Sequence, residues 1–277
     1  MKEFESDRLS FSIAAKTGLA AFLLATFLMV VDGWLAVIPL AGFLLLCLAA
    51  PFLPRFGFYL PIISKGISGK KAVALTFDDG PDPLTTPLLL KLLEKYQIKA
   101  TFFITGVKAA EHPGLVKELV RQGHLVGNHS YNHNYRMLFK SSPTIVEDIE
   151  AAQKVFYDIG IRPLAYRPPA GITTPRLRSA LLKTGMHLVN FSCRSLDGGN
   201  RRISNIAKRI LERLCTNDIV LLHDNRPPDQ SLIPVWLEEI ENLLIAIETK
   251  GFVVLPLSEL IGVPVMTTLN GWVEEAR

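Results

Sequence analysis

The stretch Ala72-Val73-Ala74-Leu75-Thr76-Phe77-Asp78-Asp79-Gly80-Pro81 contains an apolar run that ends in two adjacent carboxylates. A short apolar run closed by Gly-Pro predicts a buried β-strand followed by a turn. Neighbouring carboxylates repel each other and are costly to desolvate, so a strand that ends in them indicates a cation or a proton between them. The alternative interpretation is that the pair caps a helix beginning near Pro83.

Two histidines, His129 and His133, follow about fifty residues later. A separation of four residues is common for a pair of metal ligands. One carboxylate and two imidazoles leave coordination positions open on a divalent metal, which a hydrolytic site requires. Taken alone, the two histidines are also compatible with surface or hydrogen-bonded positions.

From residue 71 onward, short apolar runs alternate with amphipathic stretches. The runs that predict strands are 72–77, 100–104, 125–127, 164–167, 188–191, 219–223 and 252–255. The stretches that predict helices lie near 85–96, 107–122, 142–158, 175–185, 203–214 and 233–250. Strands that alternate with helices in this way predict a parallel α/β sheet, open or closed into a barrel.

In parallel α/β folds the chemistry gathers at the carboxyl ends of the strands. The polar residues of interest fall at or just after predicted strand ends, in the order Asp78 and Asp79, His129 and His133, Arg167, Asp197, and His223 with Asp224. Singly, each has a structural explanation: Arg167 as a salt-bridge partner, Asp197 as a turn residue before two glycines, and His223 as a buried, hydrogen-bonded histidine. Their shared position at one rim favours a common site.

Four motifs in this order are similar to those of the polysaccharide deacetylases, the NodB-homology or carbohydrate esterase family 4 domain. Thr76–Gly80 resembles the first motif, His129–His133 the second, Arg167–Gly171 the third and Leu221–Asp224 the fifth. The resemblance covers about residues 70–262. It implies a distorted (β/α)7 barrel and metal-dependent removal of an N- or O-acyl group from a sugar.

The resemblance also implies a role for each residue at the rim. The implied metal ligands are Asp79, His129 and His133. Asp78 would be the general base, His223 the general acid, Arg167 the residue that holds Asp78, and Asp197 the residue that sets the protonation of His223. In chemical terms, a divalent ion can lower the pKa of bound water to about 7, and a base and an acid then move the protons. Such a ligand set accepts zinc, and also cobalt, nickel or manganese.

The fourth motif departs from the family pattern. The family usually has Asp-Trp there, whereas this chain has Asp197-Gly198, which leaves the floor of the acyl pocket undefined. The third motif often carries Tyr where Ala170 stands, but the backbone N–H that would serve the oxyanion is still present. Arg201-Arg202, a little further on, is interpreted as a solvated helix start rather than a phosphate contact.

The first seventy residues hold two dense apolar stretches, one from about Phe11 to Val31 and one from Trp34 to about Leu53. Each is close to the ~20 residues that cross a hydrocarbon core, and Asp32-Gly33 between them indicates a turn. We therefore predict a two-helix transmembrane hairpin. A cleaved signal peptide, a lipoprotein signal at Cys47 and a buried core hairpin are weaker alternatives, the last because polar positions are almost lacking.

Basic residues flank both ends of the predicted hairpin and none lies at its tip; they are Lys2, Arg8, Lys16, Arg55, Lys65, Lys70 and Lys71. The positive-inside tendency then places the following domain on the cytoplasmic side of the cell membrane. The predicted division is a tail, hairpin and linker over residues 1–70, a deacetylase domain over 71–265, and a C-terminal segment over 266–277 that gives no structural or functional prediction.

Composition excludes other classes. The net charge is +4 with no long basic run, so nucleic-acid binding has little support. Three cysteines, Cys47, Cys193 and Cys215, argue against a disulfide framework. The sequence thus predicts a membrane-anchored, metal-dependent hydrolase of an N-acyl glycan, with a lipid-linked sugar as one candidate substrate. The rivals are the same enzyme facing outward, acting on an envelope polysaccharide, and a non-catalytic glycan-binding protein on a deacetylase frame.

Overall fold

A single parallel sheet forms the centre of the protein. The computed structural model describes residues 11–269. Eight strands make up the sheet: β1 (Ala72–Asp78), β2 (Thr101–Ile104), β3 (Leu125–Asn128), β5 (Ala165–Tyr166), β6 (His187–Leu188), β7 (Cys193–Arg194), β8 (Ile219–His223) and β9 (Val253–Val254). Seven of them lie in the order β6-β5-β3-β2-β1-β8-β7, and β9 pairs with the first residues of β1.

The sheet curves into an open half-barrel, with β6 and β7 as its two edges. The prediction of a parallel α/β sheet is confirmed. The predicted (β/α)7 barrel does not close, because β6 and β7 do not pair with each other. The short connection between these two edge strands explains why they stay unpaired. Only four residues separate β6 from β7, and two neighbouring parallel strands need a crossover of a dozen or more residues.

Strand β1 separates two parts of the core. All seven of its residues are buried. Because side chains alternate along a strand, Val73, Leu75 and Phe77 pack in the larger core cluster, beneath the outer helices. Ala72 and Ala74 point the other way, into a smaller cluster. A central strand buried on both faces explains its nearly continuous apolar sequence.

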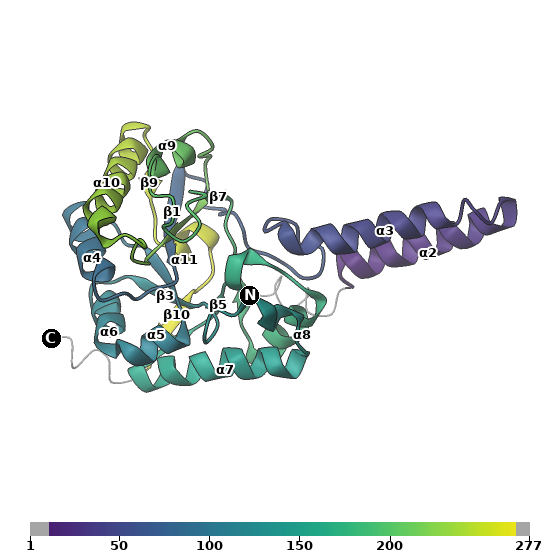
Figure 1. Cartoon of the computed structure of the whole chain (residues 1–277), viewed down its shortest axis with the longest axis horizontal. Helices are drawn as coiled ribbons and strands as arrows, with labels where there is room; N and C mark the ends of the chain where they lie inside the picture. Colours follow the sequence, from purple (N-terminus) through teal and green to yellow (C-terminus); the bar gives the residue numbers. More distant parts are fainter. Residues whose placement is uncertain (1–10, 270–277) are drawn as a thin grey trace.

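Helices cover the outside of the sheet (Figure 1). They are α4 (Thr85–Lys95), α5 (Gly106–Glu111), α6 (Pro113–Arg121), α7 (Ser142–Ile159), α8 (Pro175–Thr184), α9 (Ile206–Leu211), α10 (Ile233–Thr249) and α11 (Leu257–Ile261). The single helix predicted near 107–122 is divided into α5 and α6, because His112 precedes Pro113 and leaves the helical conformation. Helix α11 and the pair of β4 (Ile161–Pro163) with β10 (Met266–Thr268) were not predicted.

The N-terminal apolar segment forms two helices, α2 (Ile13–Val31) and α3 (Val37–Ala49), which lie side by side and project from the domain (Figure 1). By length and composition, α2 qualifies as a candidate membrane span. The second helix is shorter than predicted, because a turn over Gly33–Ala36 precedes it and the chain tightens into η1 (Ala50–Phe52). Within residues 11–269, one helix of spanning length is therefore found rather than the predicted two.

Hydrogen bonds tie the base of the hairpin to the domain. The backbone N–H of Thr173 donates to the Pro51 carbonyl at 3.1 Å. The side-chain amide of Asn190 donates to the Pro54 carbonyl at 3.0 Å. The linker that follows adds isolated bridges from Ile63 and Lys65 to the domain. The base of the hairpin is therefore fixed to the domain close to β6 and is not joined to it by a flexible linker alone.

Candidate active site

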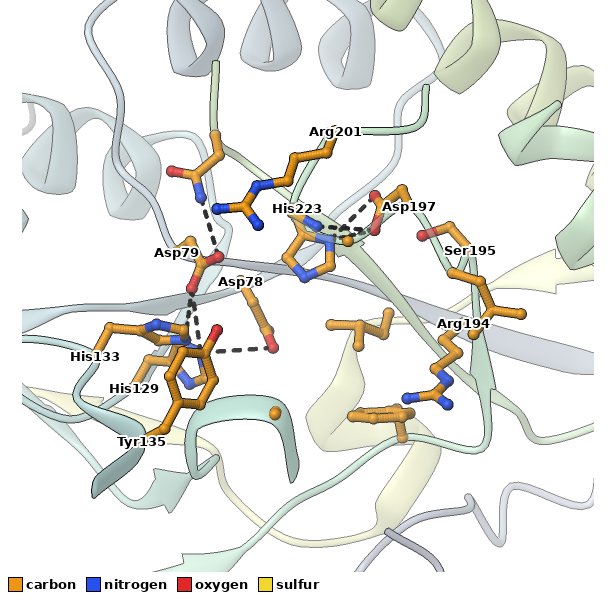
Figure 2. A pocket seen from close by; sticks show the side chains of 17 residues that line it. Asp78, Asp79, His129, His133, Tyr135, Arg194, Ser195, Asp197, Arg201 and His223 are labelled. Atoms are coloured by element: carbon orange, nitrogen blue, oxygen red, sulfur yellow. Dashed lines mark hydrogen bonds and ion pairs between the residues drawn. The ribbon is translucent and has the colours of Figure 1, made fainter. Parts of the chain in front are cut away.

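A pocket of about 700 Å³ opens at the carboxyl ends of the strands (Figure 2). Six of the seven predicted site residues line it: Asp78, Asp79, His129, His133, Asp197 and His223. The seventh, Arg167, is fully buried behind Asp78. The parallel sheet accounts for this convergence, because the strand ends that precede these residues lie at one edge. Asp78 and His223 are register partners on β1 and β8.

Asp79, His129 and His133 form one cluster on one side of the pocket. The Nε2 atom of His133 lies 3.0 Å from Asp79 Oδ1, and Nε2 of His129 lies 3.4 Å from the same oxygen. One ligand atom from each residue falls within 4.8 Å of the others, a spacing at which three groups can hold one metal ion. The structure therefore brings together the three predicted metal ligands.

The second contacts of these residues suit a cation. Nδ1 of His129 lies 2.7 Å from the Arg167 carbonyl, so it carries the N–H and the ring orientation is fixed, as in metal sites with an ordered outer shell. Asp79 Oδ2 accepts from the Asn225 amide at 3.0 Å. In contrast, Asp79 Oδ1 is buried and has no hydrogen-bond donor among the described residues. A buried carboxylate oxygen facing two imidazole nitrogens fits a divalent cation between them.

The pKa values of the three residues depend on burial and on the charges of their neighbours. Burial alone would raise the pKa of the Asp79 carboxyl, but contact with His129 and the neighbouring histidines holds it well below its usual range. Burial and the adjacent His129 lower the pKa of His133 to about 4. Burial would also lower the pKa of His129, yet Asp78 and Asp79 raise it. Asp79 is thus ionised and His133 is neutral at pH 7. The two carboxylates favour the protonated form of His129.

Asp78 is fixed by a buried arginine. Arg167 Nη1 donates to Asp78 Oδ1 at 2.7 Å and to Thr76 Oγ1 at 2.8 Å. The rest of the guanidinium donates to the carbonyls of Val189 and Asn190. Because Oδ1 is occupied, the other oxygen of Asp78 faces the pocket, 3.8 Å from Nε2 of His129. The carboxylate is therefore held next to the candidate metal site without being enclosed by it.

His223 and Asp197 form a second carboxylate–imidazole pair across the pocket. Nδ1 of His223 lies 2.8 Å from Asp197 Oδ1, and Asp197 is almost fully buried. Burial alone would lower the pKa of His223, but the bond to Asp197 and the negative charges of Asp197, Asp79 and Asp78 raise it to about 9. With Nδ1 engaged, Nε2 is directed toward the pocket (Figure 2). The arrangement presents a protonated imidazole to whatever the pocket holds.

Several lining residues were missed by the sequence analysis. Asn225 directly follows the motif that ends at Asp224, so its position beyond a strand end was an available signal. Tyr135 packs edge-on against the His133 ring, with centroids 4.8 Å apart, and only its nearness to the second motif pointed to it. Arg194 and Arg201 also line the pocket; Arg201 is thus a pocket residue rather than only a solvated helix start.

Part of the pocket wall is apolar, although the fourth-motif indole is missing. Phe191, Leu196 and Leu221 line it together with Ala170. Four of the lining residues, Asp79, His133, Ala170 and Leu196, have positive φ values between 55° and 72°. Left-handed backbone at residues other than glycine clusters at functional sites, where the surrounding fold holds it. The backbone geometry marks the same pocket as the side chains do.

Comparison with known proteins agrees with this geometry. Residues 65–189 match the family model described as polysaccharide deacetylase. The chain is 34% identical over 196 residues to the peptidoglycan-N-acetylglucosamine deacetylase of Bacillus cereus, covering 70% of this chain and 90% of that protein. The chain belongs to the polysaccharide deacetylase family. As a member, it is a hydrolase of carbon–nitrogen bonds in linear amides.

Two further relatives support the assignment of this deacetylase. The chitooligosaccharide deacetylase of a Bradyrhizobium strain is 31% identical over 204 residues, covering 70% of this chain and 92% of the relative. A crystal structure of a peptidoglycan N-acetylglucosamine deacetylase superposes with a TM-score of 0.66 at 27% identity, over 74% of this chain and 94% of that one. The family model starts at residue 65, so the apolar helices α2 and α3 lie outside it.

Proposed function

We propose that this deacetylase removes the acetyl group from an N-acetylated sugar of a glycan, using a divalent metal held by Asp79, His129 and His133. One observation carries the proposal: the three ligand groups lie in one pocket between Asp78 and His223, which are register partners on neighbouring strands. That the relatives are named for peptidoglycan and chitooligosaccharide substrates supports an N-acetylglucosamine-containing glycan. A non-catalytic glycan-binding role is the alternative.

Each proton transfer has an assigned residue. Asp78, with Oδ1 held by Arg167, accepts the proton of the attacking water through its free oxygen. His223, kept protonated by Asp197, donates a proton to the leaving sugar nitrogen through Nε2. The backbone N–H of Ala170 stabilises the negative charge that develops on the acyl oxygen. These roles are the ones that the family resemblance implies for the residues at this rim.

A divalent metal at Asp79, His129 and His133 would polarise the acyl carbonyl. It would also lower the pKa of a nearby water, so that Asp78 can deprotonate this water for attack on the carbonyl carbon. Zinc suits one carboxylate and two imidazoles, and cobalt, nickel or manganese suit the same donors. The apolar wall of Phe191, Leu196 and Leu221 favours a small acyl group with a methyl end. We therefore infer a Zn²⁺-dependent N-deacetylase acting on an acetamido sugar.

The domain over residues 71–265 carries this chemistry, and the preceding hairpin anchors it in the cell membrane. Exposed apolar side chains on both helices support insertion of α2 and α3 together, among them Phe22, Phe27, Leu44 and Leu45. A two-pass hairpin with basic flanks predicts a cytoplasmic catalytic domain, while the peptidoglycan relatives favour an outward one. Reporter fusions at residue 269, one active only outside and one only in the cytoplasm, decide the side.

The test of the proposed function measures acetate released by the full-length protein in detergent, with bound metal quantified in the same sample. The substrates are chitooligosaccharides, peptidoglycan fragments and a lipid-linked N-acetylglucosamine. Acetate from at least one substrate, lost with Asp78→Asn, supports the proposal. Metal-loaded protein that releases no acetate from any of them contradicts it and favours the glycan-binding alternative.

A further inference from the structure

A second cavity, of about 560 Å³, lies between the base of the hairpin and the deacetylase domain. Most of its lining is apolar. The residues that form its two sides are Cys47, Leu48 and Phe52 from the hairpin, and Phe139, Thr174 and Arg176 from the domain. None of the residues assigned to catalysis lines it, so the cavity calls for an explanation of its own. We refer to it as the hairpin groove.

Two segments of the domain contribute residues to both the hairpin groove and the catalytic pocket. Segment η2 (Tyr135–Phe139) contributes Tyr135 to the pocket and Phe139 to the groove. The loop before α8 contributes Ala170 to the pocket and Thr174 to the groove. Because the same two segments border both cavities, a molecule whose sugar occupies the pocket has the groove as its neighbouring apolar surface on the side of the hairpin.

Hydrogen bonds within the protein hold the two sides of the groove in place. The bonds from Thr173 to Pro51 and from Asn190 to Pro54 hold the hairpin base against the domain. Leu48 and Phe52 nevertheless remain 61% and 64% exposed. Exposed side chains elsewhere on α2 and α3 face lipid in the proposed hairpin, but Leu48 and Phe52 border a cavity whose other side is the domain. An apolar ligand seated there would bury them, which is favourable by about 25 cal/mol per Å².

The size and charge of the groove define the ligand further. An α-helix is about 10 Å wide with its side chains, so 560 Å³ holds little more than one helical turn and a protein helix is a poor fit. A flexible hydrocarbon chain fits the same space. Arg176 lies at the groove, donates to the Phe139 carbonyl at 2.8 Å, and forms no ion pair within residues 11–269. A guanidinium in this position suits a phosphate.

We propose that the hairpin groove binds the polyprenyl chain of a lipid-linked substrate, with Arg176 on its phosphate and the N-acetyl sugar in the catalytic pocket. This inference rests on the proposed function and narrows its substrate class to glycans carried on a polyprenyl phosphate. It also gives the hairpin a part in substrate recognition, because one wall of the groove belongs to α3 and η1.

A crosslinking experiment tests the groove without requiring turnover. The full-length protein in lipid nanodiscs is exposed to a polyprenyl phosphate that carries a diazirine near its phosphate, and to a phospholipid with the same diazirine. We expect the polyprenyl probe to label groove residues such as Phe139 and Phe52, and the phospholipid to label the outer faces of α2 and α3. The same labelling pattern for both probes, or no groove labelling by the polyprenyl probe, overturns the proposal.

Matched variants sharpen this test. Leu48→Trp fills the groove, whereas Leu45→Trp places the same side chain on the same helix, where Leu45 is exposed outside the groove. Groove labelling should fall ~10-fold in Leu48→Trp, a change equivalent to losing the burial of about two methylenes, and stay unchanged in Leu45→Trp. Arg176→Gln should weaken labelling by the polyprenyl phosphate but not by the matching polyprenol. Equal effects of the two Trp variants would contradict the assignment.

Turnover separates failure of this inference from failure of the proposed function. For a lipid-linked N-acetylglucosamine, Leu48→Trp should raise KM by ~10-fold, while kcat/KM for a soluble chitooligosaccharide stays at the wild-type value. One outcome rejects the groove as a binding site but leaves the proposed deacetylase function standing. In that outcome Leu48→Trp has wild-type activity on the soluble substrate and no change in KM for the lipid-linked one. Absence of acetate from both substrates rejects the deacetylase, and the crosslinking result then still decides whether the groove binds a polyprenyl chain.

Discussion

Two carboxylate–imidazole clusters face each other across one pocket and differ in which nitrogen meets the carboxylate. In the cluster of Asp79, His129 and His133, the two Nε2 atoms converge on a single carboxylate oxygen, for which no hydrogen-bond donor is found between residues 11 and 269. In the pair of Asp197 and His223, the carboxylate binds Nδ1 and leaves Nε2 toward the pocket. Similar groups therefore form an arrangement that suits a cation in one case and a proton donor in the other.

The outer contacts create this difference. The Arg167 carbonyl occupies Nδ1 of His129 at 2.7 Å, which leaves Nε2 for the cation. Asp197 itself occupies Nδ1 of His223 and supplies the charge that keeps the ring protonated. A histidine at a strand end has no fixed role: the contact at Nδ1 fixes which nitrogen is left free, and the charges around the ring bias its protonation. Four substitutions test this contrast.

The largest effect is expected for His129→Ala, which removes one of the converging nitrogens. Metal content should fall with activity, and the rate should drop by more than ~10⁴-fold, beyond what a single proton-transfer group contributes. Metal analysis and acetate release on the same purified sample measure both quantities. His112→Ala is the control, because His112 lies outside the pocket and makes no side-chain capping bond. Normal metal occupancy in His129→Ala would contradict the ligand assignment.

Asp78→Asn should separate the base from the ligand next to it. We expect the metal to remain bound, because Asp79 and both histidines are intact, and turnover to fall by ~10²–10⁴-fold. The amide still accepts a hydrogen bond from Arg167, so folding should be preserved, as a thermal unfolding curve can show. A variant that retains full kcat would refute the role of Asp78 as general base.

Asn225→Ala tests the outer contact of the metal cluster. Without the amide, Asp79 Oδ2 loses its donor at 3.0 Å, and the carboxylate is free to turn away from the histidines. Loss of such an outer partner typically costs 10–100-fold in metal affinity, and a competition titration with a chelator measures it. Activity at saturating metal should recover. Unchanged metal affinity would mean that Asn225 plays no part in orienting Asp79.

The smallest effect is expected for Asp197→Asn, and it should depend on pH. The wild-type pKa of about 9 keeps His223 protonated at pH 8. Removing the negative charge lowers that pKa toward its ordinary value near 6.5, so the basic limb of the kcat/KM profile should move to lower pH and activity at pH 8 should fall ~10-fold. At pH 6 the two proteins should differ little. An unmoved basic limb would exclude His223 as the titrating acid.

The sequence alone was enough to predict that these residues gather at one rim, because each lies at or just after a strand end and parallel strands end at one edge. Adjacent residues could be assigned to separate functions only through the family resemblance. The position of Asn225 beyond a strand end indicated that it lies near the site, but its contact with Asp79 Oδ2 depends on the path of the chain after β8, which the sequence pattern does not define. The apolar wall of Phe191 and Leu196 was equally hidden, because it depends on how the chain packs on either side of β7.

The differences between the predicted and the observed elements have local physical causes. The two-residue strand β7 carries too few residues for an alternating pattern, so periodicity could not define it. β10 lies in the C-terminal segment that gave no prediction, and it forms only because β4 offers an antiparallel partner. The second apolar helix is shorter than its run of hydrophobic residues, since composition does not reveal how many residues the turn after Asp32 requires.

The pairing of Asp78 with His223 along β1 and β8 has a mechanical consequence. The distance between the proposed general base and the proposed general acid is governed by the spacing of neighbouring strands, ~4.8 Å, and not by any loop. Loops around the rim can change length or composition while this separation stays constant. A slip of β8 by one residue, however, would turn the imidazole to the opposite side of the sheet and abolish the reaction without altering a single side chain.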